Sequence, residues 1–482
     1  MSPAASARWG DPVLWGAGAL LLVSLLAVLA LAAFAPHPAF ALAVPLAGAG
    51  VVAFRKASAH PLTPLAGLLL LAAFALSRSE GVQPIELAFA AYFYGFIGMW
   101  FVRRLFVFRE PVVRDSREAV LLWYPVMVGG SLVTAQAYGF DLSMARNAWV
   151  SFSALWIYFP IREACERHAR GPALVVAGFC VMAATAFVRN VVQLQRTFTE
   201  AEYAWEVARA RATSNEILIL SAALFCIALA ASSKRWRGTA LGALGFGVFS
   251  LGLILTQWRA YYAALALGTL LLTVLLKGRS RKRLVFIGMG SLACVVGAAY
   301  VALGDAVSLL ALGLLDRVLS IGTAGSADVS LLNRVFESAA QWDLIKQSPI
   351  VGYGIGTQFS FFDATTYSTW TKPYSHNGYF HLWFKFGIIG LTAFLYAWGR
   401  STWDGWRAYR APGASVEGLA AAITLIAVIP SSFVSNPFST TDVLLCFGIL
   451  MGTAAGCRAR ASGAAAPGVS ELSAPRAGTS RG

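Results

Sequence analysis

Residues 333–356 read NRVFESAAQWDLIKQSPIVGYGIG, and residues 373–391 read PYSHNGYFHLWFKFGIIGL. The first segment has apolar side chains at the spacing of one helical face, so it predicts an amphipathic helix. Pro349 ends this helix, because proline has no N–H to donate and clashes with the preceding turn. The turn that follows contains Gly352, Gly354 and Gly356. Glycines at this spacing indicate backbone angles that other residues avoid.

The second segment predicts the start of an apolar helix. Ser375 and Asn377 are suitable N-cap residues, so His376 lies at the mouth of this helix. The positive end of the helix dipole disfavours a charged imidazole, which leaves the ring neutral and able to accept a proton. A lone histidine is usually structural. Here His376 stands beside Asn377 and Tyr374 at a helix end, and we predict that it is a general base.

The composition places these segments in a membrane protein. Of 482 residues, 58% are hydrophobic and 13% are charged, and the mean hydropathy is +0.65. Soluble domains carry about twice that charged fraction. Apolar blocks recur along the whole chain, so we predict an all-α, polytopic helical membrane protein with about 12–14 transmembrane helices. The predicted spans are Val13–Phe34, Phe40–Phe54, Leu62–Leu76, Pro84–Phe101, Ala119–Ala135, Ala148–Ile161, Pro172–Val188, Glu216–Ala231, Thr239–Leu255, Tyr261–Leu276, Leu284–Leu303, Tyr379–Tyr396, Leu419–Val434 and Val443–Gly456.

The placement of Lys and Arg predicts the orientation of these spans. Basic residues concentrate in alternate connections, and connections rich in them stay cytoplasmic. Both termini are therefore predicted to be cytoplasmic, and the net charge of +15 reflects topology rather than nucleic-acid binding. The predicted organisation is transmembrane helices within 1–304 with an outer segment 189–215, a large outer loop 305–375, transmembrane helices within 376–456, and a disordered tail 457–482.

Arginines on the predicted outer side break the usual charge bias. Arg189 closes the seventh predicted span, Arg196 follows it, and Arg259 lies in a tight turn between two spans. A guanidinium group suits the paired oxygens of a phosphate or diphosphate. The alternative is that such residues snorkel to lipid headgroups, which we favour for Arg196. For Arg259 we favour a functional role, and we also favour one for Arg189.

The predicted loop helix carries Arg334 three residues before Glu337. A structural ion pair and a substrate contact are equally open for this pair, since exposed pairs contribute little stability. The candidate substrate-binding residues are Arg334, Asn377, Tyr261, Glu337, Arg196 and Tyr374. The sequence has no nucleotide-binding loop and no metal-type His/Cys spacing, so we predict no cofactor and no metal.

These motifs resemble a known family. Arg334, Trp342 and the PIVGYG segment 349–354, followed by SHN at 375–377 and FGIIGL at 386–391, resemble the signature of the O-antigen ligase and polymerase superfamily. The turn TQWRAYYAAL at 256–265 is similar to that family's short arginine turn. The resemblance covers mainly residues 240–455.

The resemblance implies a GT-C-like fold with a large periplasmic loop that contains amphipathic helices. It implies a multi-pass protein of the bacterial inner membrane whose active site faces the periplasm. The activity would be a metal-independent, inverting glycosyl transfer from an undecaprenyl-diphosphate-linked glycan. Arg259 and Arg189 would grip the diphosphate, His376 would deprotonate the acceptor hydroxyl, and Arg334 would be a second contact to an anionic group.

The acceptor divides the family. A polymerase extends lipid-linked O-antigen or exopolysaccharide repeat units, and a ligase transfers the glycan to lipid A–core. The number of spans, the chain length and the nearly neutral outer loops favour a polymerase, with the ligase as the alternative. A lipid-linked glycan flippase is a further alternative, but it should show two related halves and polar residues at mid-membrane depth. The implied partners are membrane lipids and a chain-length regulator protein, and no nucleic acid.

Overall fold

A computed structural model describes residues 62–76, 83–200, 215–303, 329–364, 366–412 and 414–463. The first two predicted spans and the predicted tail lie outside these residues, as do parts of the two long outer segments. The α-helices are α3 (Thr63–Ala75), α4 (Pro84–Val102), α5 (Ser116–Gly130), α6 (Leu132–Tyr138), α7 (Leu142–Ser153), α8 (Tyr158–Arg167), α9 (Gly171–Glu200), α11 (Glu216–Ser232), α12 (Trp236–Leu255), α13 (Arg259–Leu275), α14 (Gly278–Leu303), α16 (Val329–Gln347), α17 (Gly378–Arg410), α18 (Val416–Ser431) and α19 (Thr441–Ala461). A π-helical turn η1 (Arg103–Val107) and a 3₁₀ turn η2 (Ala154–Ile157) join neighbouring helices.

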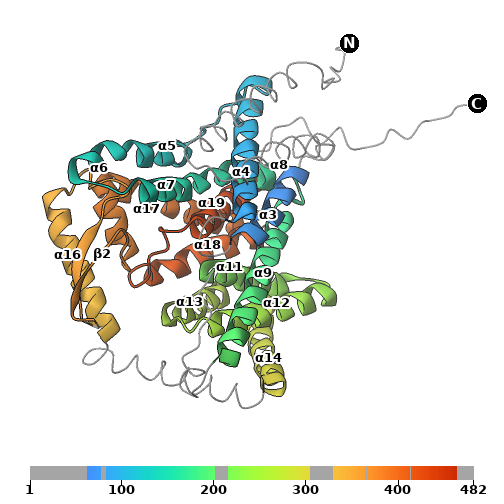
Figure 1. Cartoon of the computed structure of the whole chain (residues 1–482). Helices are drawn as coiled ribbons and strands as arrows, with labels where there is room; N and C mark the ends of the chain where they lie inside the picture. Colours follow the sequence, from blue (N-terminus) through green and yellow to red (C-terminus); the bar gives the residue numbers. More distant parts are fainter. Residues whose placement is uncertain are drawn as a thin grey trace, which may run out of the picture.

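The predicted fold class is confirmed, because the described residues form an all-α polytopic membrane protein (Figure 1). Every predicted span within them is helical over most of its length. Six helical segments in the described ranges are long and apolar enough to cross a membrane, namely Pro84–Val107, Ser116–Tyr138, Gly171–Thr197, Trp236–Leu255, Gly378–Arg410 and Thr441–Ala461. Four shorter apolar helices, α3, α11, α13 and α18, accompany them. A helix of about 20 residues matches the thickness of the hydrocarbon core.

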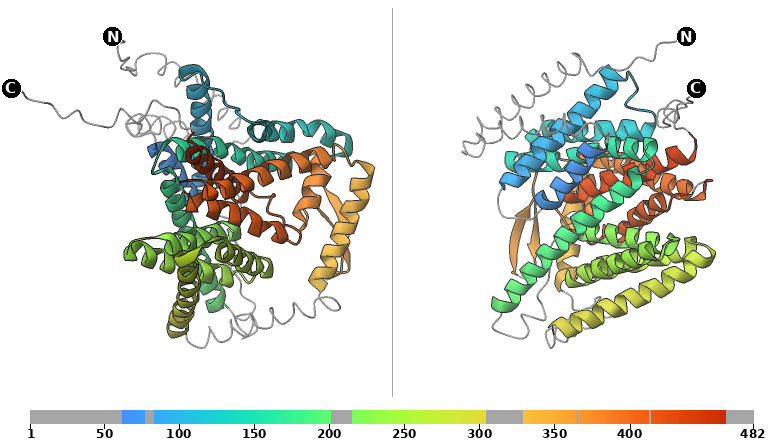
Figure 2. Two further views of the ribbon diagram at one scale, coloured as in Figure 1. Left: turned by 180° about the vertical axis from the view of Figure 1, so that it is seen from behind. Right: turned by 90° about the vertical axis from the view of Figure 1, so that its right-hand side faces the viewer.

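The C-terminal helices form the centre of the bundle. In the views of Figures 1 and 2, α17, α18 and α19 lie between helices α5–α7 and helices α11–α13. Glycines on α19 explain its close packing against η2 and α8. A methyl group at Gly448, Gly452 or Gly456 would lie within 2.7 Å of an atom of residues 157–162. Small residues at this four-residue spacing let two membrane helices approach closely.

Helix α17 is broken at Gly387, whose backbone angles are φ 63° and ψ −173°. The break leaves carbonyl groups of α17 without hydrogen-bond donors from the helix itself. The glycine-rich segment after α16 supplies N–H donors for these carbonyl groups. The N–H groups of Tyr353 and Gly354 donate to the carbonyl oxygens of Phe384 and Lys385, both at 2.8 Å. Backbone polar groups need such partners wherever water is excluded.

The same segment is held from two further sides. Lys385, a buried charge in the predicted twelfth span, donates to the carbonyl and hydroxyl oxygens of Thr357. Ile355 N donates to Ser131 Oγ at 3.2 Å, and Asp141 N donates to Gly356 O at 3.0 Å. The positive φ angles predicted for the three turn glycines are confirmed, at 70°, 85° and 79°. The turn is therefore fixed between α17 and the α5–α7 helices.

The polar linker after this turn is a β-hairpin, which the sequence analysis did not predict. Strand β1 (Phe359–Asp363) pairs antiparallel with β2 (Ser368–Lys372), with Phe359 opposite Lys372. Asn333 of α16 accepts a hydrogen bond from Ala364 N at 2.6 Å, which fastens the helix to the hairpin. Figure 1 shows α16 and β2 side by side at one end of the molecule.

At the other end of α17, many arginines of the predicted cytoplasmic connections form ion pairs. Arg117 lies 2.5 Å from Asp404 and 2.7 Å from Asp115. Further pairs join Arg104 to Glu110 and Glu163, Arg114 to Glu166, Arg162 to Glu118, and Arg167 to Glu110. These contacts tie the α4–α5 connection to α8 and α17.

We expect Gly387→Ala to lower the free energy of unfolding by more than about 2 kcal/mol. A side chain at positive φ costs roughly 1–2 kcal/mol, and the new methyl group would also lie 1.9 Å from Ile350 O. The matched control is Gly399→Ala in the same helix, where nothing lies within 4 Å of the added methyl group. This change should be neutral or stabilising by about 1 kcal/mol at most. Thermal unfolding in detergent checks both, and equal melting temperatures for the two variants would contradict the docked break.

Candidate functional site

His376 lies directly before α17, where Asn377 caps the helix. The side-chain oxygen of Asn377 accepts hydrogen bonds from the N–H groups of Tyr379 and Phe380, both at 3.1 Å. The predicted N-cap is therefore confirmed. The side chain of His376 remains 44% exposed, which leaves it accessible at the helix end.

The carboxylate of Glu337 holds His376 from α16. Glu337 Oε2 lies 2.7 Å from His376 Nδ1, and Glu337 Oε1 accepts from the His376 backbone N–H at 2.9 Å. Glu337 is 2% exposed, so its carboxylate is held inside the protein. The imidazole of His376 is accessible to solvent. A carboxylate at Nδ1 favours the tautomer that carries its proton there. Nε2 is then the nitrogen that can accept a proton.

Lys372 completes the surroundings of Glu337. Its Nζ lies 2.9 Å from Glu337 Oε1, and it also lies over the rings of Phe361 at 4.6 Å and Tyr374 at 5.4 Å. Burial by itself would raise the pKa of Glu337. The hydrogen bond and charge of His376, together with those of Lys372, outweigh burial and hold the pKa of Glu337 below its ordinary value of 4.5. Glu337 therefore stays ionised beside the imidazole at neutral pH.

Arg189 belongs to a second polar cluster, on α9. Its Nη2 donates to Leu76 O at 2.9 Å and to Asn215 Oδ1 at 3.2 Å. Asn215 in turn donates to Asp442 Oδ2 at 2.7 Å, at the start of α19. Arg189 Nη1 is buried and has no hydrogen-bond partner among the described residues. Arg189 thus has one nitrogen engaged by the fold and one available to a ligand.

Arg259 is the first residue of α13 and is half-buried. The tight turn before it has Gln257 at φ 53°, which reverses the chain between α12 and α13. Tyr261 is 3% exposed and its ring lies against Trp258 at 5.9 Å, so it supports the turn from within the core.

The start of α17, beside His376, contacts the end of α18. Gly378 N, next to the cap, donates to Ser432 O at 2.8 Å, at the end of α18. The connection from Ser432 to α19 then leads to Asp442, which contacts Asn215 of the Arg189 cluster. A single connection, residues 432–441, therefore joins the surroundings of His376 to the cluster around Arg189.

Helix α12, which leads into Arg259, packs beside α9 and α11. A methyl group on Gly252 of α12 would lie 2.8 Å from the ring of Phe187 and 3.6 Å from Ile219. Phe187 is two residues before Arg189, and Ile219 is one turn after Asn215. Because α9 continues to Glu200, Arg189 lies within this helix rather than at its end.

The remaining candidates lie around these groups. Arg334 is half-buried on α16, one turn before Glu337. Tyr374 is 48% exposed and contacts Lys372. Arg196 is exposed, two turns beyond Arg189 on α9. Within the described ranges, no group of three or more His, Cys, Asp or Glu side chains has an arrangement that holds a metal ion.

Sequence reasoning missed three polar residues of this region. Lys372, Asn215 and Asp442 were not among the candidates. Lys372 contacts Glu337, Asn215 contacts Arg189, and Asp442 contacts Asn215. Asp442 had a detectable signal, because it is a carboxylate at the start of an apolar span, where charges are rare and often functional. Lys372 had no such signal in the sequence, because Glu337, which it contacts, is far away in the chain.

Comparison with known families identifies the domain that contains the His376–Glu337 pair. Residues 244–395 match the family model described as O-Antigen ligase. This match supports membership in the O-antigen ligase and polymerase superfamily. The O-antigen ligase domain begins within α12 and ends within α17, so it contains Arg259, Glu337 and His376, whereas Arg189 lies outside it. No curated protein matches the chain.

The lowered pKa of Glu337 predicts how pH affects stability. A carboxyl group with a depressed folded-state pKa contributes stability above its unfolded pKa of about 4.5, and this is lost as pH falls further. We expect Glu337→Gln to cost about 1–3 kcal/mol at pH 7, with the difference from wild type shrinking below pH 4.5.

Thermal unfolding of both proteins in detergent from pH 3.5 to pH 7 measures this difference. The control is Asp343→Asn, because Asp343 pairs with Lys346 on the same helix but is 68% exposed. An exposed pair contributes little, so this change should have almost no effect. A loss in Glu337→Gln that is no larger than that of the control at pH 7 would refute the buried pair.

Proposed function

We propose that this chain transfers a glycan from undecaprenyl diphosphate to an acceptor hydroxyl, by a metal-independent inverting displacement at the periplasmic face of the inner membrane. The observation that carries the proposal is the His376–Glu337 contact inside the O-antigen ligase domain, with Nδ1 2.7 Å from Oε2. An imidazole oriented by a buried carboxylate, open to solvent at a helix end, has the features of a general base.

Each group has a place in the transfer. The acceptor oxygen attacks the anomeric carbon on the side opposite to the diphosphate, and His376 Nε2 takes the hydroxyl proton. The bond between the anomeric carbon and the diphosphate oxygen breaks, and the diphosphate leaves with the electron pair. Glu337 stabilises the imidazolium that forms, in the way that a fixed carboxylate orients a base.

Arg259 and Arg189 neutralise the charge that develops on the leaving diphosphate. Arg189 lies on α9, which packs against α12, the helix that leads into Arg259. The unpartnered Nη1 of Arg189 supports this role, since a buried guanidinium nitrogen without a partner is costly until it binds an anion. Arg334 is the further anionic contact on α16.

The other candidates act at a distance from the reacting atoms. Asn377 holds the start of α17 through its side-chain oxygen, and Tyr261 supports the turn before Arg259. Glu337 is a positioning residue for His376. Tyr374 and Arg196 are exposed and remain candidates for contacts to the glycan or its phosphates.

The acceptor is proposed to be a second lipid-linked repeat unit, which makes the protein a polymerase. Transfer to lipid A–core is the second candidate, and the description of the matched family as O-Antigen ligase favours it. Both reactions use the same donor and the same base. The description of the matched family as O-Antigen ligase supports transfer over transport.

The acceptor can be determined with purified protein in liposomes. Undecaprenyl-diphosphate-linked repeat units are supplied alone or with lipid A–core, without an ion gradient. We expect elongated lipid-linked glycan in both mixtures, visible as a ladder on a gel. Glycan attached only to lipid A–core would replace the polymerase by the ligase. Absence of any glycosidic product, with translocation of the intact donor, would overturn the enzyme.

Substitutions separate the roles of the base and the diphosphate contact. His376→Ala should lower kcat by about 10²–10⁴-fold with little change in donor affinity, because it removes the proton acceptor. Arg259→Ala should abolish transfer and weaken donor binding, with normal abundance and melting temperature. The control is Arg237→Ala, an exposed arginine at the opposite end of α12. A loss in His376→Ala confined to donor affinity would remove its role as base.

A further inference from the structure

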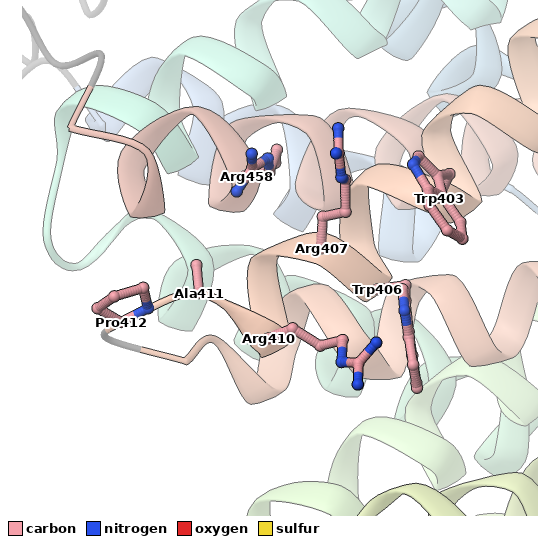
Figure 3. Close-up of a pocket in the computed structure, with 7 residues that line it drawn as sticks. All are labelled: Trp403, Trp406, Arg407, Arg410, Ala411, Pro412 and Arg458. Atoms are coloured by element: carbon pink, nitrogen blue, oxygen red, sulfur yellow. The ribbon is translucent and has the colours of Figure 1, made fainter.

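An open hollow lies at the end of α17 remote from His376. Its volume is about 480 Å³. Figure 3 shows the side chains around it, which come from the ends of α17 and α19. The residues that line it are Trp403, Trp406, Arg407, Arg410, Ala411, Pro412 and Arg458.

The three arginines of this hollow lack acidic partners. No Asp or Glu of the described residues lies within 4.0 Å of Arg407, Arg410 or Arg458 in an ion pair. By contrast, Arg104, Arg114, Arg162 and Arg167 are paired with carboxylates. The acidic residue of α17 nearest in sequence, Asp404, is occupied by Arg117. Three positive groups therefore face one space without neutralisation.

A helix dipole explains part of this arrangement. Arg407 and Arg410 stand in the last turn of α17, and Arg458 stands in the last turn of α19, where cations are favoured. The dipole does not account for the open volume between the two helix ends. The dipole also does not account for the aromatic partners of two of these arginines. We take the open volume and these partners together as an indication of a ligand.

Two indole rings orient the guanidinium groups. Arg407 lies over Trp403 at 5.8 Å, and Arg410 lies over Trp406 at 5.2 Å. A cation over an indole face is attracted to it and loses part of its freedom before any ligand arrives. Tryptophan is also enriched at the level of lipid headgroups, and α17 is one of the candidate spans. Two tryptophans at the end of a candidate span are typical of the level of lipid headgroups, where phosphates are available.

We propose that this hollow binds the phosphate of an anionic phospholipid headgroup, such as that of phosphatidylglycerol. Guanidinium groups bind phosphate oxygens in pairs, and three of them around one space match a single phosphodiester with its neighbouring hydroxyls. A free phosphate ester offers the same chemistry. The membrane depth and the adjoining apolar span favour the lipid. This site is independent of the proposed glycan transfer, because it lies at the opposite end of α17.

Native mass spectrometry of the purified full-length protein tests the site. The protein is equilibrated in detergent with equal amounts of phosphatidylglycerol and phosphatidylcholine, and the retained lipids are counted. We expect wild type to retain phosphatidylglycerol in preference, and the triple variant Arg407→Gln, Arg410→Gln, Arg458→Gln to retain about tenfold less. The matched control is Lys234→Gln, Arg235→Gln, Arg237→Gln, which removes the same charge and includes an arginine stacked on Trp236. It should retain phosphatidylglycerol as wild type does.

Competition separates the two sources of phosphate. Inorganic phosphate and glycerol 3-phosphate at millimolar concentration should leave the bound phosphatidylglycerol in place. Displacement by either would show a site for a soluble anion and overturn the lipid assignment. Equal losses in the two triple variants, or no preference of wild type for the anionic lipid, would overturn the site itself. If the triple variant does not fold, Arg458→Gln alone is measured, and it should still lower retention severalfold.

Discussion

The backbone pairing at the break in α17 is the contact on which the candidate site depends. A helix interrupted at Gly387 leaves the carbonyl groups of Phe384 and Lys385 without partners, and Tyr353 and Gly354 supply the missing N–H groups. In a membrane protein water cannot do this, so the break and the turn need each other. The turn is attached to α16, and its docking brings Glu337 within hydrogen-bond distance of His376. The contact of His376 with Glu337 therefore depends on backbone hydrogen bonds at Phe384 and Lys385, further along α17.

The charges of the protein are divided between the two ends of the bundle. At one end, Glu337, Lys372 and His376 form a compact group in which each charge has a partner. Arg189 lies at the same end with one nitrogen still unpartnered among the described residues. At the other end, ion pairs join the α4–α5 connection to α8 and α17, whereas Arg407, Arg410 and Arg458 have none among the described residues. Charges without partners thus occur where a ligand of opposite charge is proposed at each end.

Much of the fold and part of the candidate site could be predicted from the sequence. The features that were missed have physical explanations. Membrane spans, the helix stop at Pro349, the turn glycines and the cap at Asn377 depend on local patterns, and the structure confirms them. The hairpin between α16 and α17 was missed because its strands are short, rich in Ser and Thr, and stabilised mainly by contact with α16. Contacts between residues far apart in the sequence produce no repeating pattern from which they could be predicted. Examples are Lys372 with Glu337 and Asn215 with Asp442. His376 was found because its type and its place at a helix start are both local features.

The connection between α18 and α19 has a mechanical consequence. It is anchored at Ser432 beside the cap of α17, and α19 begins just before Asp442 in the cluster of Arg189. A shift of either anchor is transmitted along a few residues to the other, because both neighbouring helices are packed in the core. In the proposed reaction, the contact of Arg189 with the diphosphate and the orientation of the His376 imidazole would therefore be linked through this connection.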